Sequence, residues 1–207
     1  TRSERLQLSS QVHPLFITRG VPGTHDAALL EEVMDALMNR RSCKVPRFDK
    51  SIDDRCSEQG WSDYSAPVDF ILFEGWCNNS PVQSQAELVR PVNELEAEED
   101  AEGVWRHYAN EQLKDYHQRI FKHADMSIML NASDFERIYE WRSLQEQKLK
   151  ASSCDQQHVM NDVELKRFIQ HYERISRHTL SHLPYTADIV LPIAADHSIS
   201  GIIQNNV

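Results

Sequence analysis

The chain has 207 residues, a formal net charge of −10 and an apolar share of 40%. This length suits one domain with a sizeable core, so we expect a single globular domain over residues 1–207. The negative charge argues against nucleic-acid binding and against adhesion to an anionic membrane, because both need a basic surface. Salt screens exposed charges beyond roughly 10 Å, so a local arginine cluster can still bind a small anion.

The cysteines and the apolar runs indicate the compartment. No CxxC pair occurs, so we expect reduced, structural thiols and neither a disulfide framework nor a zinc site at Cys43, Cys56, Cys77 and Cys154. The first residues carry no apolar signal core, and no run approaches the ~18 apolar residues of a membrane span. The default expectation is therefore a cytoplasmic protein; the oligomeric state is not indicated.

The first predicted elements surround a glycine-rich loop. Residues 19–26 hold two glycines and a proline, which predicts a shaped loop. A helix with Thr24 as its N-cap is expected next, because apolar side chains recur at helical spacing at Leu30, Val33, Met34 and Leu37. Residues 44–48 read as a short edge strand interrupted by a proline. The apolar run VDFILF at 68–73 predicts a strand buried on both faces.

The second half alternates helices and strands. The acidic run 94–102 is interpreted as the solvated start of a helix. Asn161 and Glu164 nearly form a capping box at the start of a long helix. The predicted elements are helices at 104–124, 135–149 and from 161, strands at 126–130 and 187–193, a loop at 151–158, and either an edge strand or a tail at 198–207. This alternation indicates an α/β fold with a mainly parallel sheet.

Three polar clusters follow predicted strands or lie in glycine-rich loops, where α/β proteins bind ligands. The clusters are Arg19, His25 and Asp26; then Arg47, Asp49, Asp53, Asp54 and Arg55; then Glu74, Gly75 and Trp76. Loop charges commonly face solvent or cap local backbone groups, so each cluster alone is weak. A carboxylate after a buried strand needs a partner, so Glu74 either faces a magnesium ion or an attacking hydroxyl, or forms a buried ion pair.

A fourth element is the helix at 135–149. Arg142 and Glu146 are i,i+4 neighbours and could form a surface pair, with Arg137 one turn earlier. The functional alternative is a lid over residues 135–160 whose Arg142 reaches a transferring phosphate, since arginine binds phosphate bidentately. Neither an HExxH pattern nor a GxSxG elbow occurs, so zinc catalysis and hydrolase chemistry gain little support.

Several motifs resemble the D-glycerate 3-kinase family and its bacterial relatives. They are HPLFITRGVPGTHD (13–26), VPRFDKSIDDR (45–55), FEGW (73–76), PVNELE (91–96), YEWRSLQEQKL (139–149) and FIQHYERIS (168–176). They occur in the family's order and span the chain from about 13 to 193. The family is related to uridine kinase, phosphoribulokinase and pantothenate kinase, which implies a P-loop kinase fold with a parallel sheet flanked by helices.

The resemblance implies an enzyme that uses ATP and Mg²⁺ to phosphorylate a small hydroxy-acid substrate, D-glycerate, to 3-phosphoglycerate. It places Glu74 near magnesium. It assigns Arg142, Gln145 and Glu146 to the lid, and Arg19, His25, Asp26, Arg47, Asp49, Asp53 and Arg55 to the acceptor pocket, with Trp76 beside them.

The sequence departs from the family at its start. Family members begin with a GxxxxGK[ST] loop and an aspartate-rich DDFY-type motif, and neither occurs in these 207 residues. We therefore expect a truncated chain that lacks its first strand, is inactive alone and exposes apolar strand edges. The alternatives are a P-loop kinase for another metabolite, such as pantothenate or a nucleoside, and a non-catalytic module that has lost its P-loop.

Overall fold

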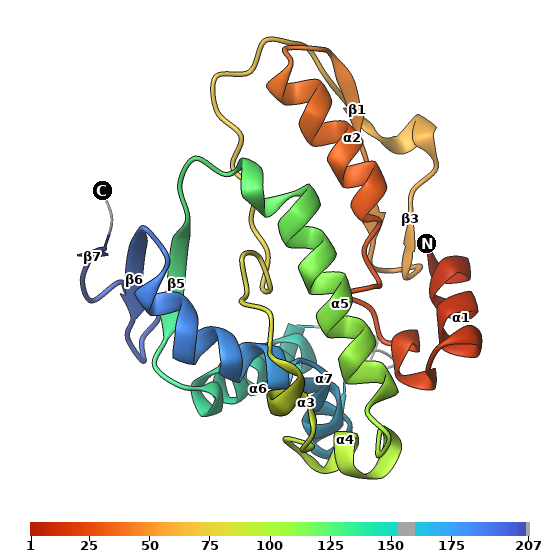
Figure 1. The fold of residues 1–207 in the computed structure, drawn as a ribbon, viewed down its shortest axis with the longest axis vertical. Coiled ribbons are helices and arrows are strands. Elements are labelled where there is room, and N and C mark those ends of the chain that lie inside the picture. The colour runs from red at the N-terminus through yellow and green to blue at the C-terminus, as the bar shows by residue number, and fades with distance from the viewer. Residues whose placement is uncertain (153–159, 206–207) are drawn as a thin grey trace. The chain divides into compact units, whose positions relative to one another are not determined.

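The computed structural model describes residues 1–152 and 160–205, and it has the expected α/β character (Figure 1). The chain forms two compact units. Unit 1 comprises Thr1–Asn78 and Val104–His123, and unit 2 comprises Asn79–Gly103 and the chain from Ala124 onward. Cys154 and most of the expected loop at 151–158 lie outside the described residues. Among the described helices, none combines the length and apolarity needed to cross a membrane.

Unit 1 is mainly helical, with short antiparallel strand pairs. Strand β1 pairs with β4, and β2 pairs with β3. Its elements are α1 (Arg2–Gln11), η1 (Pro14–Ile17), α2 (Ala27–Met38), β1 (Cys43–Val45), β2 (Phe48–Asp49), β3 (Asp54–Arg55), η2 (Glu58–Gly60), β4 (Ser62–Tyr64), α5 (Val104–Arg119) and η3 (Phe121–His123). The strand expected at 44–48 is thus two strands, because Pro46 separates β1 from β2 and cannot donate to a ladder.

The N-terminal helix α1 is not among the elements that the sequence predicted. Thr1 and Glu4 form a capping box at its start, which satisfies free backbone N–H groups. The helix buries the charged side chain of Arg5, which is 5% exposed. Its few apolar residues show no clear stripe, so periodicity gave no signal.

The core of unit 1 forms where η1 packs against α5. Phe16 is fully buried, and its ring meets Tyr108 edge-on at a centroid distance of 5.1 Å. Along α5 the buried apolar side chains recur on one face, as the spacing predicts, at Trp105, Ala109, Leu113 and Tyr116. This face holds α5 beside the loop at 19–26.

The expected strand at 68–73 is wrong. Residues 68–73 have no strand assignment, and Phe70 and Leu72 are 94% and 91% exposed. A strand needs a neighbour for its backbone N–H and C=O groups, and no described strand pairs with this run. The apolar composition therefore shows that residues 68–73 could be buried, but most of them are exposed in this structure.

Unit 2 contains the longest strand pair. Strands β5 and β6 run parallel over five residue pairs, and β7 adds to β6 in antiparallel orientation, so the chain end is an edge strand. The elements are α3 (Gln85–Leu88), α4 (Glu94–Glu99), β5 (Ile128–Ala132), α6 (Phe135–Ser152), α7 (Asp162–His182), η5 (Leu183–Tyr185), β6 (Ile189–Ile193) and β7 (Ile203–Gln204). Ile128 and Leu130 of β5 have exposed side chains on one face of the sheet.

Helix α7 begins as predicted, with the full capping box of Asn161 and Glu164. One face of α7 packs against α6, where Phe135, Leu165 and Ile169 form a buried cluster. A second cluster holds α7 and η5 against the β5–β6 pair, at Met129, Leu183, Ala187 and Val190.

The acidic run is only partly solvated, which corrects its interpretation. It forms α4 with Asn93 as N-cap, and Glu96 within it is fully buried. Arg174 of α7 donates two hydrogen bonds to this carboxylate, from Nε at 2.7 Å and from Nη2 at 2.6 Å. A buried carboxylate requires such a partner, and the partner lies 78 residues away in sequence.

Candidate active site

The glycine-rich loop at 19–26 is closed by its own side chains. Gly20 N–H donates to Thr24 Oγ1 at 2.8 Å, and Thr24 Oγ1 donates to the Val21 carbonyl at 2.7 Å. Thr24 therefore closes the loop, and the prediction that it is the N-cap is wrong. The N-cap of α2 is Asp26, which accepts from Leu29 N–H. Gly23 has φ +100°, and a Cβ there would lie 3.0 Å from the Tyr108 ring, so only glycine suits this position.

Two aspartates hold three arginines beside this loop. Asp53 pairs with both Arg5 and Arg19. Arg55 Nη1 donates to Asp26 at 2.6 Å. Partial burial alone would raise the pKa of Asp53, but the hydrogen bonds from its two arginines outweigh this and hold the pKa below its usual value.

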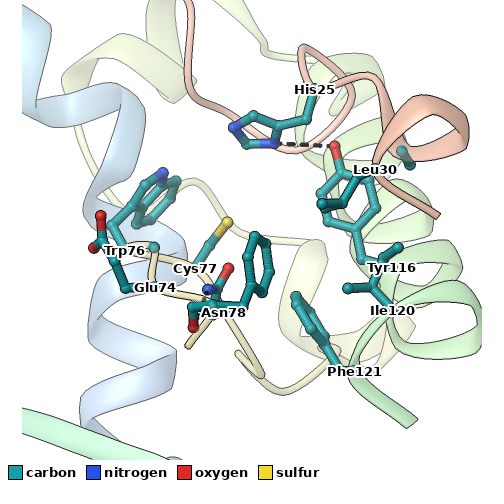
Figure 2. A pocket seen from close by; sticks show the side chains of 12 residues that line it. His25, Leu30, Glu74, Trp76, Cys77, Asn78, Tyr116, Ile120 and Phe121 are labelled. Atoms are coloured by element: carbon teal, nitrogen blue, oxygen red, sulfur yellow. Dashed lines mark hydrogen bonds between the residues drawn. The ribbon is translucent and has the colours of Figure 1, made fainter. Parts of the chain in front are cut away.

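A cavity of about 230 Å³ lies next to the loop (Figure 2). It is bounded by three segments of unit 1: the start of α2, the turn that follows the 68–73 run, and the end of α5. The lining residues are His25, Ala27, Leu30, Phe73, Glu74, Gly75, Trp76, Cys77, Asn78, Tyr116, Ile120 and Phe121. Its lining is mostly apolar with a few polar groups, which is typical of small-molecule sites.

His25 and Tyr116 form the polar pair of the cavity (Figure 2). The Tyr116 hydroxyl accepts from Gly23 N–H at 2.8 Å and lies 3.1 Å from His25 Nδ1. Desolvation lowers the pKa of His25 below its usual value, which favours the neutral ring. The hydroxyl and Nδ1 are therefore within hydrogen-bond distance, and which of them donates depends on the tautomer of His25.

Glu74 and Trp76 enter the cavity from the turn at residues 73–78. Trp76 Nε1–H donates to the Gly20 carbonyl at 2.7 Å, which ties this turn to the glycine-rich loop. Glu74 is exposed, so the alternative of a buried ion pair is wrong, and its place beside a magnesium ion stays a prediction. The reason is the missing strand: without a buried strand before it, Glu74 remains in contact with solvent.

Arg47 and Asp49 do not line this cavity. Arg47 lies in the turn between β1 and β2 with an exposed side chain. Asp49 accepts from the N–H and the hydroxyl of Ser51, at 2.8 and 2.6 Å, in a local Asx turn. The structure thus groups Arg19, Asp53, Asp26 and Arg55, but leaves these two residues with local or solvent-facing roles.

The three predicted lid residues lie together on α6 in unit 2. Arg142 Nη2 pairs with Glu146 at 2.5 Å, and Arg142 Nη1 donates to Gln145 at 2.5 Å. The guanidinium also stacks over Phe168 at 5.5 Å. Glu146 is 3% exposed, so the pair is not the simple surface pair that spacing allowed. Arg142 Nε and Glu146 Oε2 are buried without a hydrogen-bond partner among the described residues.

Sequence reasoning missed Arg5, Tyr116 and Cys77. Tyr116 looked like an ordinary core position on α5, and its hydroxyl could not be placed near His25 without the fold. Burial raises the pKa of Cys77 to about 12, so this residue is the inert, structural thiol that was expected. Cys43, Cys56 and Cys77 are free thiols, as predicted.

No family model matches the sequence. Curated relatives do match. One is the uncharacterized kinase mug58 of Schizosaccharomyces pombe, 30% identical over 83% of this chain and 63% of its own length. Another is the chloroplastic D-glycerate 3-kinase of Arabidopsis thaliana, 29% identical over 74% of this chain and 32% of its own. The chain therefore spans less than two thirds of either relative.

A solved D-glycerate 3-kinase from Cryptococcus neoformans has the same fold. It superposes with a TM-score of 0.78 at 23% identity, covering 99% of this chain and 76% of that one. The fold of this solved kinase agrees with the fold of the present chain. The sequence of the chain is similar to those of curated kinases, which include a D-glycerate 3-kinase. Together these likenesses support membership of the D-glycerate 3-kinase family.

Proposed function

We propose that the protein to which this chain belongs transfers the γ-phosphoryl group of ATP to a hydroxyl of D-glycerate and forms 3-phosphoglycerate. Its kinase relatives support phosphoryl transfer, and the name of the Arabidopsis relative supports the acceptor. The observation that carries the proposal is the cavity of about 230 Å³ in unit 1, which His25, Glu74 and Trp76 line. Asp26, which follows His25 in the chain, is paired with Arg55. A three-carbon hydroxy acid fits this volume.

The arginine cluster supplies positive charge for the acceptor's carboxylate. Arg19 is paired with Asp53 and Arg55 with Asp26. A guanidinium has five N–H donors, so Arg55 can bind an anion in addition to its aspartate. Their aspartates orient them in advance, which lowers the entropic cost of binding. Neutral His25 adds an imidazole to the cavity lining that can form a hydrogen bond with the acceptor.

Glu74 is the residue that best fits a role beside Mg²⁺. Its carboxylate lines the cavity and is exposed, and magnesium in kinases is bound through one or two carboxylates together with waters and phosphate oxygens. When bound, the ion would neutralise charge on the transferring phosphoryl group. The acceptor oxygen forms the new bond to the γ-phosphorus as ADP departs and the hydroxyl loses its proton.

Arg142 is the proposed partner of the transferring phosphate on α6. Its pairing with Glu146 fixes the guanidinium, and the unpartnered buried Nε and Oε2 atoms are the groups that a bound polar ligand could satisfy. Arginine stabilises phosphoryl transition states through its planar donors.

A cytoplasmic location of the protein stays a prediction.

The test is ADP release by the full-length protein with D-glycerate, L-glycerate, pantothenate and uridine as separate acceptors. We expect turnover with D-glycerate, and ³¹P NMR should assign the product as 3-phosphoglycerate. Turnover with pantothenate or uridine but not D-glycerate would replace the proposed acceptor. ADP release with none of the acceptors, from protein that binds no ATP, would favour a non-catalytic module.

The role of Glu74 has a matched control. Glu74→Gln should lower kcat by about ten- to a hundredfold, on the scale observed for residues that support a metal. Glu58→Gln changes another exposed glutamate of unit 1, outside the cavity, and should leave kcat unchanged. Equal kcat for both variants would remove Glu74 from the proposal.

A further inference from the structure

In unit 2, one carboxylate and two imidazoles converge where α3 meets the end of α7. Glu87, His178 and His182 each present one ligand atom, and the three atoms lie within 4.8 Å of one another. The histidines are i,i+4 neighbours on α7, so they lie on one face of the helix. Spacing in the sequence did not predict this cluster, because Glu87 precedes His178 and His182 by about 90 residues.

We propose that Glu87, His178 and His182 bind a zinc ion, with water completing a tetrahedral site. Two imidazoles and one carboxylate form a donor set known from zinc sites with an open position. Magnesium is disfavoured, because it prefers oxygen ligands alone. This site is separate from the proposed kinase chemistry and does not depend on it.

The spacing between Glu87 and His178 favours a bridging ion over a direct contact. Glu87 Oε1 lies 3.6 Å from His178 Nδ1. This distance is too long for a hydrogen bond. It is close to the separation of about 3.3–3.5 Å that two ligand atoms have when each is roughly 2.0–2.2 Å from a tetrahedral zinc. His182 and Glu87 are exposed, so small rotations of these side chains can close the remaining gap.

Each ligand is held by a second group, as metal ligands in proteins usually are. His182 Nδ1 lies 2.9 Å from the His178 carbonyl oxygen, which can only accept, so Nδ1 carries the proton and Nε2 keeps the lone pair. The Val82 backbone hydrogen-bonds to the His178 ring. Glu87 Oε2 accepts from Ser84 N–H and hydroxyl, both at 2.7 Å, which leaves Oε1 for the ion.

The local charge also permits a cation. Arg174 lies one turn before His178, but its guanidinium is neutralised by Glu96. Among the three proposed ligands, Glu87 is therefore the one that carries a negative charge, and the other two are imidazoles. A zinc ion here would connect α3 to α7.

The experiment uses full-length protein purified without a histidine tag, stripped with EDTA and free of nucleotide. Co²⁺ is titrated first, because its visible spectrum distinguishes tetrahedral from octahedral coordination, and Zn²⁺ then displaces it. We expect one equivalent of tetrahedral Co²⁺ in the native protein. His182→Gln and Glu87→Gln should each weaken binding by about tenfold or more, since even an outer-shell loss has that effect.

The variants are chosen to fold. Both changed residues are exposed, and glutamine can keep the cap at Ser84, so circular dichroism should be unchanged. His123→Gln alters an exposed histidine of unit 1 and should bind Co²⁺ like the native protein. Zinc should raise the Tm of the native protein but not of His182→Gln. Octahedral Co²⁺ only, or equal affinity in all variants, would overturn the site.

Discussion

The buried ion pair between α4 and α7 gives the sharpest stability prediction. Arg174→Met leaves the Glu96 carboxylate, which is fully buried, without its two charge-assisted hydrogen bonds. Removing one partner of a buried pair costs about 3–5 kcal/mol. We expect a loss of this size in the free energy of unfolding, measured by urea denaturation at constant m-value.

A double variant separates the cost of the unpaired Glu96 carboxylate from the other contributions to the loss of stability. Adding Glu96→Leu to Arg174→Met removes the uncompensated carboxylate and should recover most of the stability. The recovery is incomplete, because Arg174 also donates to the carbonyls of Glu87 and Arg90, at 3.0 and 2.6 Å. Both hydrogen bonds are only partly buried, so we expect a residual deficit near the lower end of the range of about 1–3 kcal/mol for an unsatisfied buried group.

The exposed pair between the same two helices is the control. Lys166 Nζ lies 3.1 Å from Glu94 Oε2, with side chains 60% and 71% exposed. Lys166→Met should cost no more than about 1 kcal/mol, because solvent screens this pair. Equal costs for Lys166→Met and Arg174→Met, or a double variant no more stable than Arg174→Met, would refute the argument from burial.

Three further outcomes follow from the described contacts. Arg142→Ala should lower kcat in a saturated ADP-release assay by about ten- to a thousandfold, on the scale of one charge-stabilising donor. Gly23→Ala should lower the free energy of unfolding by about 1–3 kcal/mol, because φ is +100° and the new Cβ meets Tyr108 at 3.0 Å. Burial lowers the pKa of His171 below 6.5, so the unfolded chain binds more protons and Tm should fall as the pH drops below about 6.5; His171→Gln should weaken this dependence.

Each of these outcomes has its own check. Adding Glu146→Gln to Arg142→Ala removes the stranded buried carboxylate, so restored kcat would show that stability alone was at fault. Gly201→Ala meets nothing within 4 Å and should change stability by less than about 0.5 kcal/mol. Tm values at pH 5.5 and 7.5 that decline equally in native protein and His171→Gln would contradict the third prediction.

Local signals predicted the helices well. The capping box at Asn161, the apolar face of α5 and the start of α2 near Asp26 all depend on residues within a few positions of each other. The same holds for the loop at 19–26, where glycines impose the backbone conformation. The family motifs named His25, Glu74 and Trp76, which line the cavity, but not the partners of these residues.

Contacts between residues distant in sequence determined the features that local signals did not predict. Residues 68–73 have the composition of a buried strand, yet whether they form one depends on a neighbouring strand that composition does not specify. Glu96 looks like its solvated neighbours until Arg174 is placed opposite it, and the partner of the His25 ring, Tyr116, lies 91 residues away in sequence. The sequence determined where helices begin and which loops carry charge, because those depend on local hydrogen bonds and periodicity. The tertiary structure alone decided which charges are buried, which residues share the cavity and which histidines meet Glu87, because desolvation and pairing depend on segments distant in sequence.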